Sequence, residues 1–115
     1  MEVVGLLHRA GARVLVGTDA PEPQVPPGSS LHHEMEFLVQ SGMSPAEVLS
    51  AATLVNARVL KADDRIGSVT PGKKADLVLL DANPLTDIRN TRRISHVFKD
   101  GAALLPAEIL TAAPR

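Results

Sequence analysis

The 115-residue sequence contains no cysteine, tryptophan or tyrosine, and phenylalanine occurs only twice. Without cysteine the chain has no disulfide, no thiolate metal ligand and no cysteine nucleophile. Two phenylalanines cannot build a base-stacking platform for single-stranded nucleic acid. Lysine plus arginine number 12 against 13 acidic residues, which gives a net charge of −1. The basic face that nucleic-acid or anionic-lipid binding requires is therefore not expected.

Long hydrophobic runs are also missing, since no apolar stretch approaches the roughly 20 residues that span a bilayer. Glu2 stands where a signal peptide would carry basic residues. We therefore expect a cytoplasmic chain whose partners include neither nucleic acid nor a membrane. The hydrophobic fraction of 44% is that of an ordinary globular domain and allows a moderate core.

The first part of the sequence predicts helices around one short strand. Apolar spacing indicates a helix at 2–10, which Gly11 ends. Its predicted apolar face consists of Val3, Leu6, Leu7 and Ala10. The run 13–17 has apolar side chains at consecutive positions, so both faces of a strand there would be apolar. This pattern is typical of a parallel strand covered on both faces. Four prolines make 18–30 a stiff loop of a length that often serves function.

Two further helices are predicted after this loop. An apolar stripe of helical period covers 31–41. Ser44-Pro45-Ala46-Glu47 has the pattern of a capping box with proline at the first helical position. The helix that it opens runs toward Leu60, with Thr53 and Asn56 as interruptions.

The sequence after residue 63 changes to segments of strand length. They occupy residues 66–69, 76–81, 94–99 and 102–105. Thr70-Pro71-Gly72-Lys73 fits a type II turn, and Asp100-Gly101 fits a two-residue hairpin turn. The tail from Pro106 is ambiguous and allows a short helix. The chain therefore divides near residue 63 into a helix-rich part and a strand-rich part.

Asp19 is the main candidate for chemistry, because it follows the predicted buried strand. Ligands and catalytic groups gather at the carboxyl ends of parallel strands in α/β folds. A carboxylate there can hold a divalent cation and take a proton from bound water. Its position fits equally well a turn-forming or helix-capping aspartate.

The histidines give a weaker signal. His32 and His33 are adjacent at the start of the predicted helix 31–41, so their side chains point about 100° apart and do not readily chelate one metal. Polar surface positions are the more common explanation, although one of the pair could face the loop and a substrate. Asp76 and Asp81 bracket an apolar strand and are interpreted as strand-end caps. A catalytic zinc needs about three protein ligands, and the residues alone indicate no such cluster.

Several segments together resemble the amidohydrolase superfamily, with the closer likeness to its imidazolonepropionase-like and Xaa-Pro dipeptidase-like branch. They are Val16-Gly17-Thr18-Asp19, His32-His33-Glu34-Met35-Glu36-Phe37, Ala52-Thr53-Leu54-Val55-Asn56-Ala57-Arg58 and Gly67-Ser68-Val69-Thr70-Pro71-Gly72-Lys73-Lys74-Ala75-Asp76-Leu77-Val78. The resemblance covers residues 3–105, and the Gly-Lys-x-Ala-Asp-Leu-Val run is its most specific part.

The resemblance implies an α/β fold that is part of a larger one, because a complete (β/α)₈ barrel takes about 250 residues. Residues 1–63 would form the last strand and helices of a metal-dependent hydrolase barrel, and residues 64–115 would form strands of a small β-sandwich. Asp19 would be both a metal ligand and the general base. Of the two adjacent histidines, His32 is the one that we expect, from its place beside the loop, to bind substrate. The cofactor would be a divalent metal, zinc by expectation, in the longer parent protein, with none required in this chain alone.

The expected function is metal-dependent hydrolysis of a carbon–nitrogen bond in a small amide, cyclic amide or dipeptide. The family's His-x-His pair, its bridging lysine or glutamate and its two later histidines have no counterpart here, so the isolated chain is expected to be inactive. Two alternatives stay open. One is a non-catalytic fragment that self-associates into a homo-oligomer through an exposed strand edge. The other is a small binding module that uses the proline-rich loop.

Overall fold

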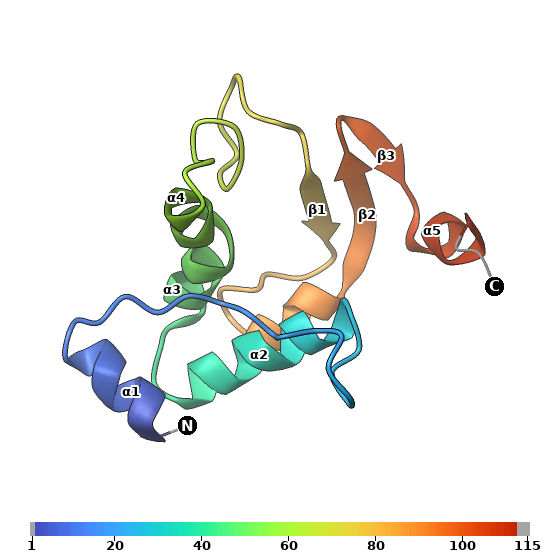
Figure 1. Cartoon of the computed structure of the whole chain (residues 1–115). Coiled ribbons are helices and arrows are strands. Elements are labelled where there is room, and N and C mark those ends of the chain that lie inside the picture. The colour runs from blue at the N-terminus through green and yellow to red at the C-terminus, as the bar shows by residue number, and fades with distance from the viewer. Residues whose placement is uncertain (1, 113–115) are drawn as a thin grey trace.

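The computed structural model describes residues 2–112, in which a helical part precedes a part that contains all the strands (Figure 1). The helical part contains α1 (Glu2–Arg9), α2 (Ser29–Gln40), α3 (Pro45–Ser50), the π-helical turn η1 (Ala51–Val55) and α4 (Asn56–Val59). The remainder contains β1 (Leu77–Leu80), the 3₁₀ helix η2 (Ile88–Arg92), β2 (Ile94–Lys99), β3 (Ala102–Leu104) and α5 (Pro106–Ala112). The chain is thus an α/β structure, as predicted.

The strands form one antiparallel sheet in the order β1-β2-β3. Asp100 and Gly101 turn β2 into β3 with φ angles of 49° and 85°, which a two-residue hairpin of the predicted type requires. The Asp76 carboxylate accepts hydrogen bonds from the Asp100 N–H and from Lys99 Nζ, both at 2.8 Å. Asp76 is therefore the strand-end cap that the sequence predicts. The Asp81 side chain makes no hydrogen bond with any described residue.

The predicted capping box fixes the start of α3. Ser44 Oγ accepts a hydrogen bond from the Glu47 N–H at 3.3 Å, and Glu47 Oε2 accepts one from the Ser44 N–H at 2.7 Å. These bonds satisfy backbone donors that the first turn of a helix leaves without partners. The interruption expected near Thr53 and Asn56 is η1, after which the chain continues as α4.

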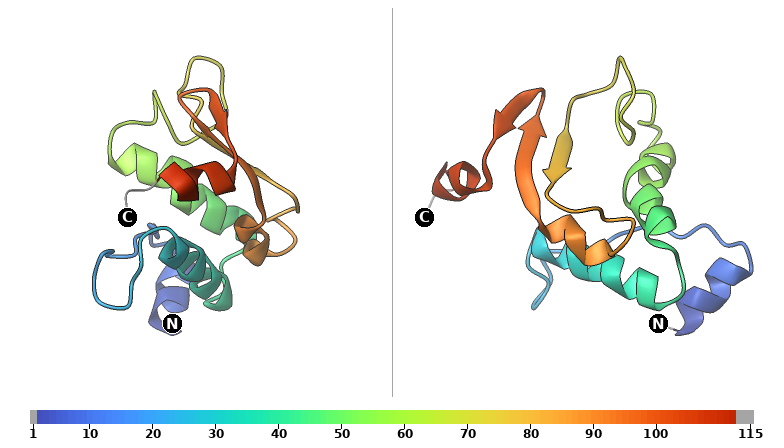
Figure 2. Two further views of the ribbon diagram at one scale, coloured as in Figure 1. Left: turned by 90° about the vertical axis from the view of Figure 1, so that its right-hand side faces the viewer. Right: turned by 180° about the vertical axis from the view of Figure 1, so that it is seen from behind.

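The hydrophobic core lies between α2, the helical run from α3 to η1, and η2. Its buried members are Val16, Met35, Leu38, Met43, Val48, Ala51 and Ile88. Val48 has no exposed surface, and Ile88 brings η2 from the strand-rich part against the helices. Seen from behind, α1 lies at one side of the molecule and the sheet with α5 lies at the other, and α2 runs between them (Figure 2).

Two predicted strands are absent from the structure. Residues 13–17 run without regular secondary structure, with Val16 buried, Val14 half-buried and Leu15 43% exposed. A strand requires a partner for its backbone groups, and none of the described strands lies beside this segment. Residues 66–68 form bends and residue 69 has no regular structure, because Gly67 takes a φ of 91° and the N–H of Ile66 bonds back to the Ala62 carbonyl.

The apolar face predicted for the first helix lies in solvent. Val3, Leu6 and Leu7 of α1 are 66%, 58% and 52% exposed. The helix instead contacts the rest of the molecule through Val4, which packs against the core, and through Gly5, whose Cα lies so close to the Ser41 carbonyl that a side chain would not fit. A helix buries only the face for which the fold provides a partner surface, and none of the described elements covers this one.

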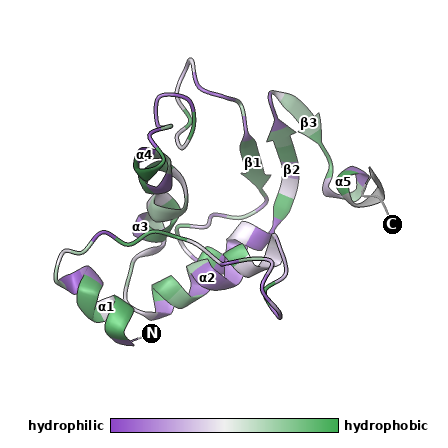
Figure 3. Ribbon diagram, in the orientation of Figure 1, coloured by the Kyte–Doolittle hydropathy of each residue, from purple (hydrophilic) through white to green (hydrophobic). Residues whose placement is uncertain are grey.

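The molecule as a whole exposes more surface than a compact chain of its size. Its accessible area is 8013 Å², whereas a compact 12.1 kDa monomer exposes about 6,000 Å². Its radius of gyration is 15.0 Å, against about 13 Å expected for this length. Large apolar side chains are among the exposed ones on both α1 and β1, whose ribbons are largely green in the hydropathy colouring (Figure 3). The consecutive residues Val78 and Leu79 point to opposite faces of β1, and both are more than half exposed.

Candidate functional site

The carboxylate of Asp19 lies free at the end of the segment 13–17. Asp19 has a φ of 56°, in the left-handed region that aspartate tolerates better than most side chains. Its backbone carbonyl accepts a hydrogen bond from the Glu22 N–H at 3.1 Å. Its exposed side chain makes no hydrogen bond or ion pair with any residue of 2–112. The backbone therefore takes part in a turn, while the carboxylate caps nothing and remains available to a ligand.

His32 is held between α2 and η2. Its Nδ1 lies 2.9 Å from Thr91 Oγ1, and the Thr91 hydroxyl donates its own proton to the Ile88 carbonyl at 2.8 Å. Thr91 can therefore only accept from the ring, so Nδ1 carries the proton and the Nε2 lone pair is not used in this contact. Burial lowers the pKa of His32 below its ordinary value, and the positive charge of Arg92 lowers it further.

An ion pair lies one helical turn along from His32. Glu36 Oε1 accepts from Arg92 Nη2 at 2.7 Å and from Arg92 Nε at 3.0 Å. His32 and Glu36 of α2 thus fasten the same short helix, η2, to the helical part. The structure places His32 in a contact that holds two elements together, and its predicted role in substrate binding stays a prediction.

The predicted site residues form no metal-binding cluster within residues 2–112. No hydrogen bond joins Asp19 to His32 in the described part of the chain. His8 lies 3.4 Å from Glu47, and His96 bonds to its neighbour Ser95, so these histidines belong to other contacts. No group of three or more histidine, aspartate or glutamate side chains within 2–112 is placed to hold a metal ion. Asp19 alone does not fit a metal, which in catalytic zinc sites has about three protein ligands.

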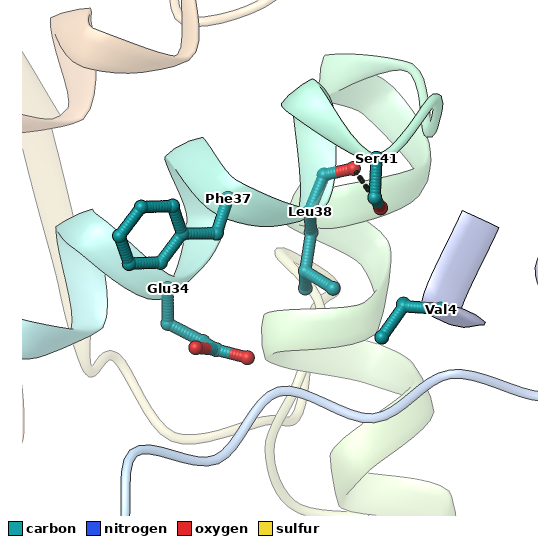
Figure 4. Close-up of a pocket in the computed structure, with 5 residues that line it drawn as sticks. All are labelled: Val4, Glu34, Phe37, Leu38 and Ser41. Carbon is teal, nitrogen blue, oxygen red and sulfur yellow. Dashed lines mark hydrogen bonds between the residues drawn. The ribbon is translucent and has the colours of Figure 1, made fainter. Parts of the chain in front are cut away.

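Two pockets lie elsewhere on the surface. One, of about 380 Å³, is lined by residues of α1, α2 and the turn after α2, namely Val4, Glu34, Phe37, Leu38 and Ser41 (Figure 4). The other, of about 540 Å³, lies between the segment 13–17 and α4, and Asn56 is the polar side chain in its lining. Neither is lined by Asp19 or His32.

Asn56 is the residue that sequence reasoning missed. Its amide accepts a hydrogen bond from the Val16 N–H at 3.3 Å and donates one to the Val16 carbonyl at 2.8 Å. The sequence predicted Asn56 only as an interruption of a helix. The available signal was an amide in a largely apolar helical stretch, since a half-buried amide needs hydrogen-bond partners.

Comparison with known proteins matches residues 1–104 to the model of the amidohydrolase family. The chain belongs to the amidohydrolase family. It is 45% identical to the imidazolonepropionase of Geobacillus sp. (strain WCH70) over 73 residues, which cover 63% of this chain and 17% of that enzyme. This membership confirms the resemblance seen in the sequence.

Solved structures of other enzymes are also similar to this amidohydrolase chain over most of its length. Phenylurea hydrolase B is 40% identical with a TM-score of 0.80, over 96% of this chain and 29% of that one. A Xaa-Pro dipeptidase with bound methionine is 28% identical with a TM-score of 0.81, over 90% of this chain and 25% of that one. The chain therefore spans less than a third of the length of each of these three relatives.

Proposed function

We propose that these residues are the C-terminal portion of a metal-dependent amidohydrolase that hydrolyses carbon–nitrogen bonds in small amides, cyclic amides or dipeptides. Residues 1–63 would provide the end of the barrel, and residues 64–115 would provide strands of the small sandwich domain. The match of residues 1–104 to the family, over about a quarter of the solved relatives, carries this proposal.

Within that enzyme, Asp19 is the residue of this chain that we assign to the site. Its carboxylate is exposed and unpaired among the described residues, which suits a group that serves a ligand instead of the fold. It would supply one oxygen ligand to a divalent metal and accept a proton. The other ligands would come from outside these 115 residues, so the isolated chain would be inactive.

His32 is proposed as a substrate-binding residue with an unusual constraint. Thr91 holds its Nδ1 proton, which leaves Nε2 as an acceptor for a substrate N–H or O–H group. Its lowered pKa keeps the ring neutral near pH 7, so Nε2 can accept. Because the same ring fastens η2 to α2, substrate binding and the attachment of the C-terminal part would share one residue.

A grafted enzyme tests this proposal. The chain replaces the matching portion of phenylurea hydrolase B, a match that covers 96% of this chain, and turnover of that enzyme's own substrate is measured. We expect the graft to be active and Asp19→Asn to lower turnover by several orders of magnitude, because both ligand charge and base are lost. Asp81→Asn is the matched control, since its carboxylate is also exposed and without a hydrogen bond among the described residues. Near-normal turnover in the Asp19 variant would show that Asp19 has another role.

A second candidate, a self-associating non-catalytic fragment, is favoured by the excess of about 2,000 Å² of exposed surface over a compact chain. Uncovered apolar faces on β1 and α1 are of the kind that obligate interfaces bury. Light scattering of the isolated chain distinguishes a homo-oligomer from a monomer. The two candidates are compatible. The apolar surface that would pack against the rest of the barrel in the longer enzyme could pack against a second copy when the chain is isolated.

A further inference from the structure

The segment 13–17 has a single hydrogen-bonded anchor within the described residues. Val16 is the one residue of this segment whose backbone groups have partners there, and both partners belong to the Asn56 amide. The amide offers one acceptor and one donor to the same residue, which is the pair of bonds that a neighbouring antiparallel strand exchanges. Asn56 therefore does for Val16 what a sheet partner would do.

The π-helical turn η1 sets the direction of this amide. A π turn holds one residue more than an α turn, so the residues after it are rotated by about 100° relative to an uninterrupted α-helix. Asn56 is the first residue after η1. The turn is also supported from outside, because Gly67 packs so closely that an added Cβ would lie 2.7 Å from Ala57 Cβ and 3.1 Å from Leu54 Cα. The helical turn that carries the Asn56 amide is therefore tightly packed.

We propose that Asn56 is a positioning residue that fixes the backbone at Val16 and thereby places the Asp19 carboxylate three residues further along. Asp19 has no side-chain partner of its own in the described part of the chain, so its location depends on the backbone that leads to it. Val16 is the last residue before Asp19 that is both buried and hydrogen-bonded. The inference rests on the proposed role of Asp19, and Asn56 itself touches no reacting atom.

The test is made on the 115-residue chain by NMR and needs no catalytic activity. Asn56→Asp keeps an oxygen for the Val16 N–H but turns a second, anionic oxygen toward the Val16 carbonyl. Asn90→Asp is the matched control, because Asn90 is also half-buried and its Nδ2 donates to a backbone carbonyl, that of Asn83, at 2.9 Å. Hydrogen exchange of the Val16 amide and the backbone order parameter of Asp19 are measured in both variants.

We expect the Asn56 variant to exchange the Val16 amide at least about tenfold faster, as loss of one to two hydrogen bonds implies. The Asp19 order parameter should fall toward the value of a flexible loop, while the Asn90 variant changes neither quantity. Lowering the pH below the ordinary aspartate pKa of about 4 makes the new side chain a neutral isostere of asparagine, so protection should return. A general loss of packing would instead speed the exchange of amides throughout the core, including those near Val48.

Unchanged exchange at Val16, or an unchanged order parameter at Asp19 once Val16 has lost protection, would overturn the inference. Should Asn56→Asp fail to fold, Asn56→Ala removes both bonds without adding a charge and gives the same two readings. An inactive graft would count against the proposed function and leave these NMR readings unaffected, so the two failures are distinguishable.

Discussion

Replacing Val48 with alanine tests where the hydrophobic core lies. Val48 is fully buried in the cluster formed by α2, α3 and η2. The substitution removes two methyl groups, each worth about 0.8 kcal/mol of transfer free energy, and the cavity left behind adds about 1 kcal/mol. The free energy of unfolding should therefore fall by about 2.5 kcal/mol. With a urea dependence of about 1–2 kcal/mol per molar for a small domain, the urea midpoint should fall by about 1.3–2.5 M.

The control for this prediction is Val69→Ala. Val69 is 86% exposed and its loss should change the free energy of unfolding by less than about 0.5 kcal/mol. Urea unfolding is followed by circular dichroism at two protein concentrations, because self-association would make the midpoint depend on concentration. Equal midpoints for the two variants would refute the placement of the core around Val48.

Three further predictions concern the capping box, a glycine contact and a histidine. Ser44→Ala should lower the free energy of unfolding by about 1 kcal/mol through loss of the N-cap acceptor. Ser50→Ala is the control, because it loses no cap hydrogen bond. Equal unfolding midpoints for the two variants would contradict this prediction. Gly67→Ala should destabilise the fold more than Gly72→Ala, since both glycines have a φ near 90° but only Gly67 has atoms where the Cβ would go. The pKa of His32 is lowered on folding, so the unfolded chain binds more protons and stability should fall as the pH drops below 6.5. An NMR titration midpoint for His32 at or above 6.5 would contradict that sign.

Local signals were sufficient for much of the fold. The Ser44 capping box, the Asp100-Gly101 hairpin and the strand 94–99 are each specified by residues within a few positions of one another, and each is present as predicted. The strand expected at 13–17 is absent because a strand depends on a partner, which a local pattern cannot provide. The apolar side of α1 was predicted to be buried for the same kind of local reason. It is exposed because none of the described elements covers it.

The candidate site was predictable only in part. Asp19 follows from its place after an apolar run, and its free carboxylate agrees with a role outside the fold. The contact of His32 with Thr91 joins residues 59 positions apart, and that of Asn56 with Val16 joins residues 40 apart. No spacing rule links such distant positions, so tertiary contacts of this kind become visible only in the folded chain.

The central claim is that this chain supplies one metal ligand, Asp19, to an amidohydrolase site and cannot form that metal site alone. Calorimetric titration with zinc, combined with light scattering on the same purified sample, tests it most directly. The account predicts no tight zinc binding, because a catalytic zinc needs about three protein ligands, together with dimers or larger assemblies formed through the uncovered apolar faces. A one-to-one zinc complex of sub-micromolar affinity in a clean monomer would contradict the account and indicate a self-contained metalloprotein.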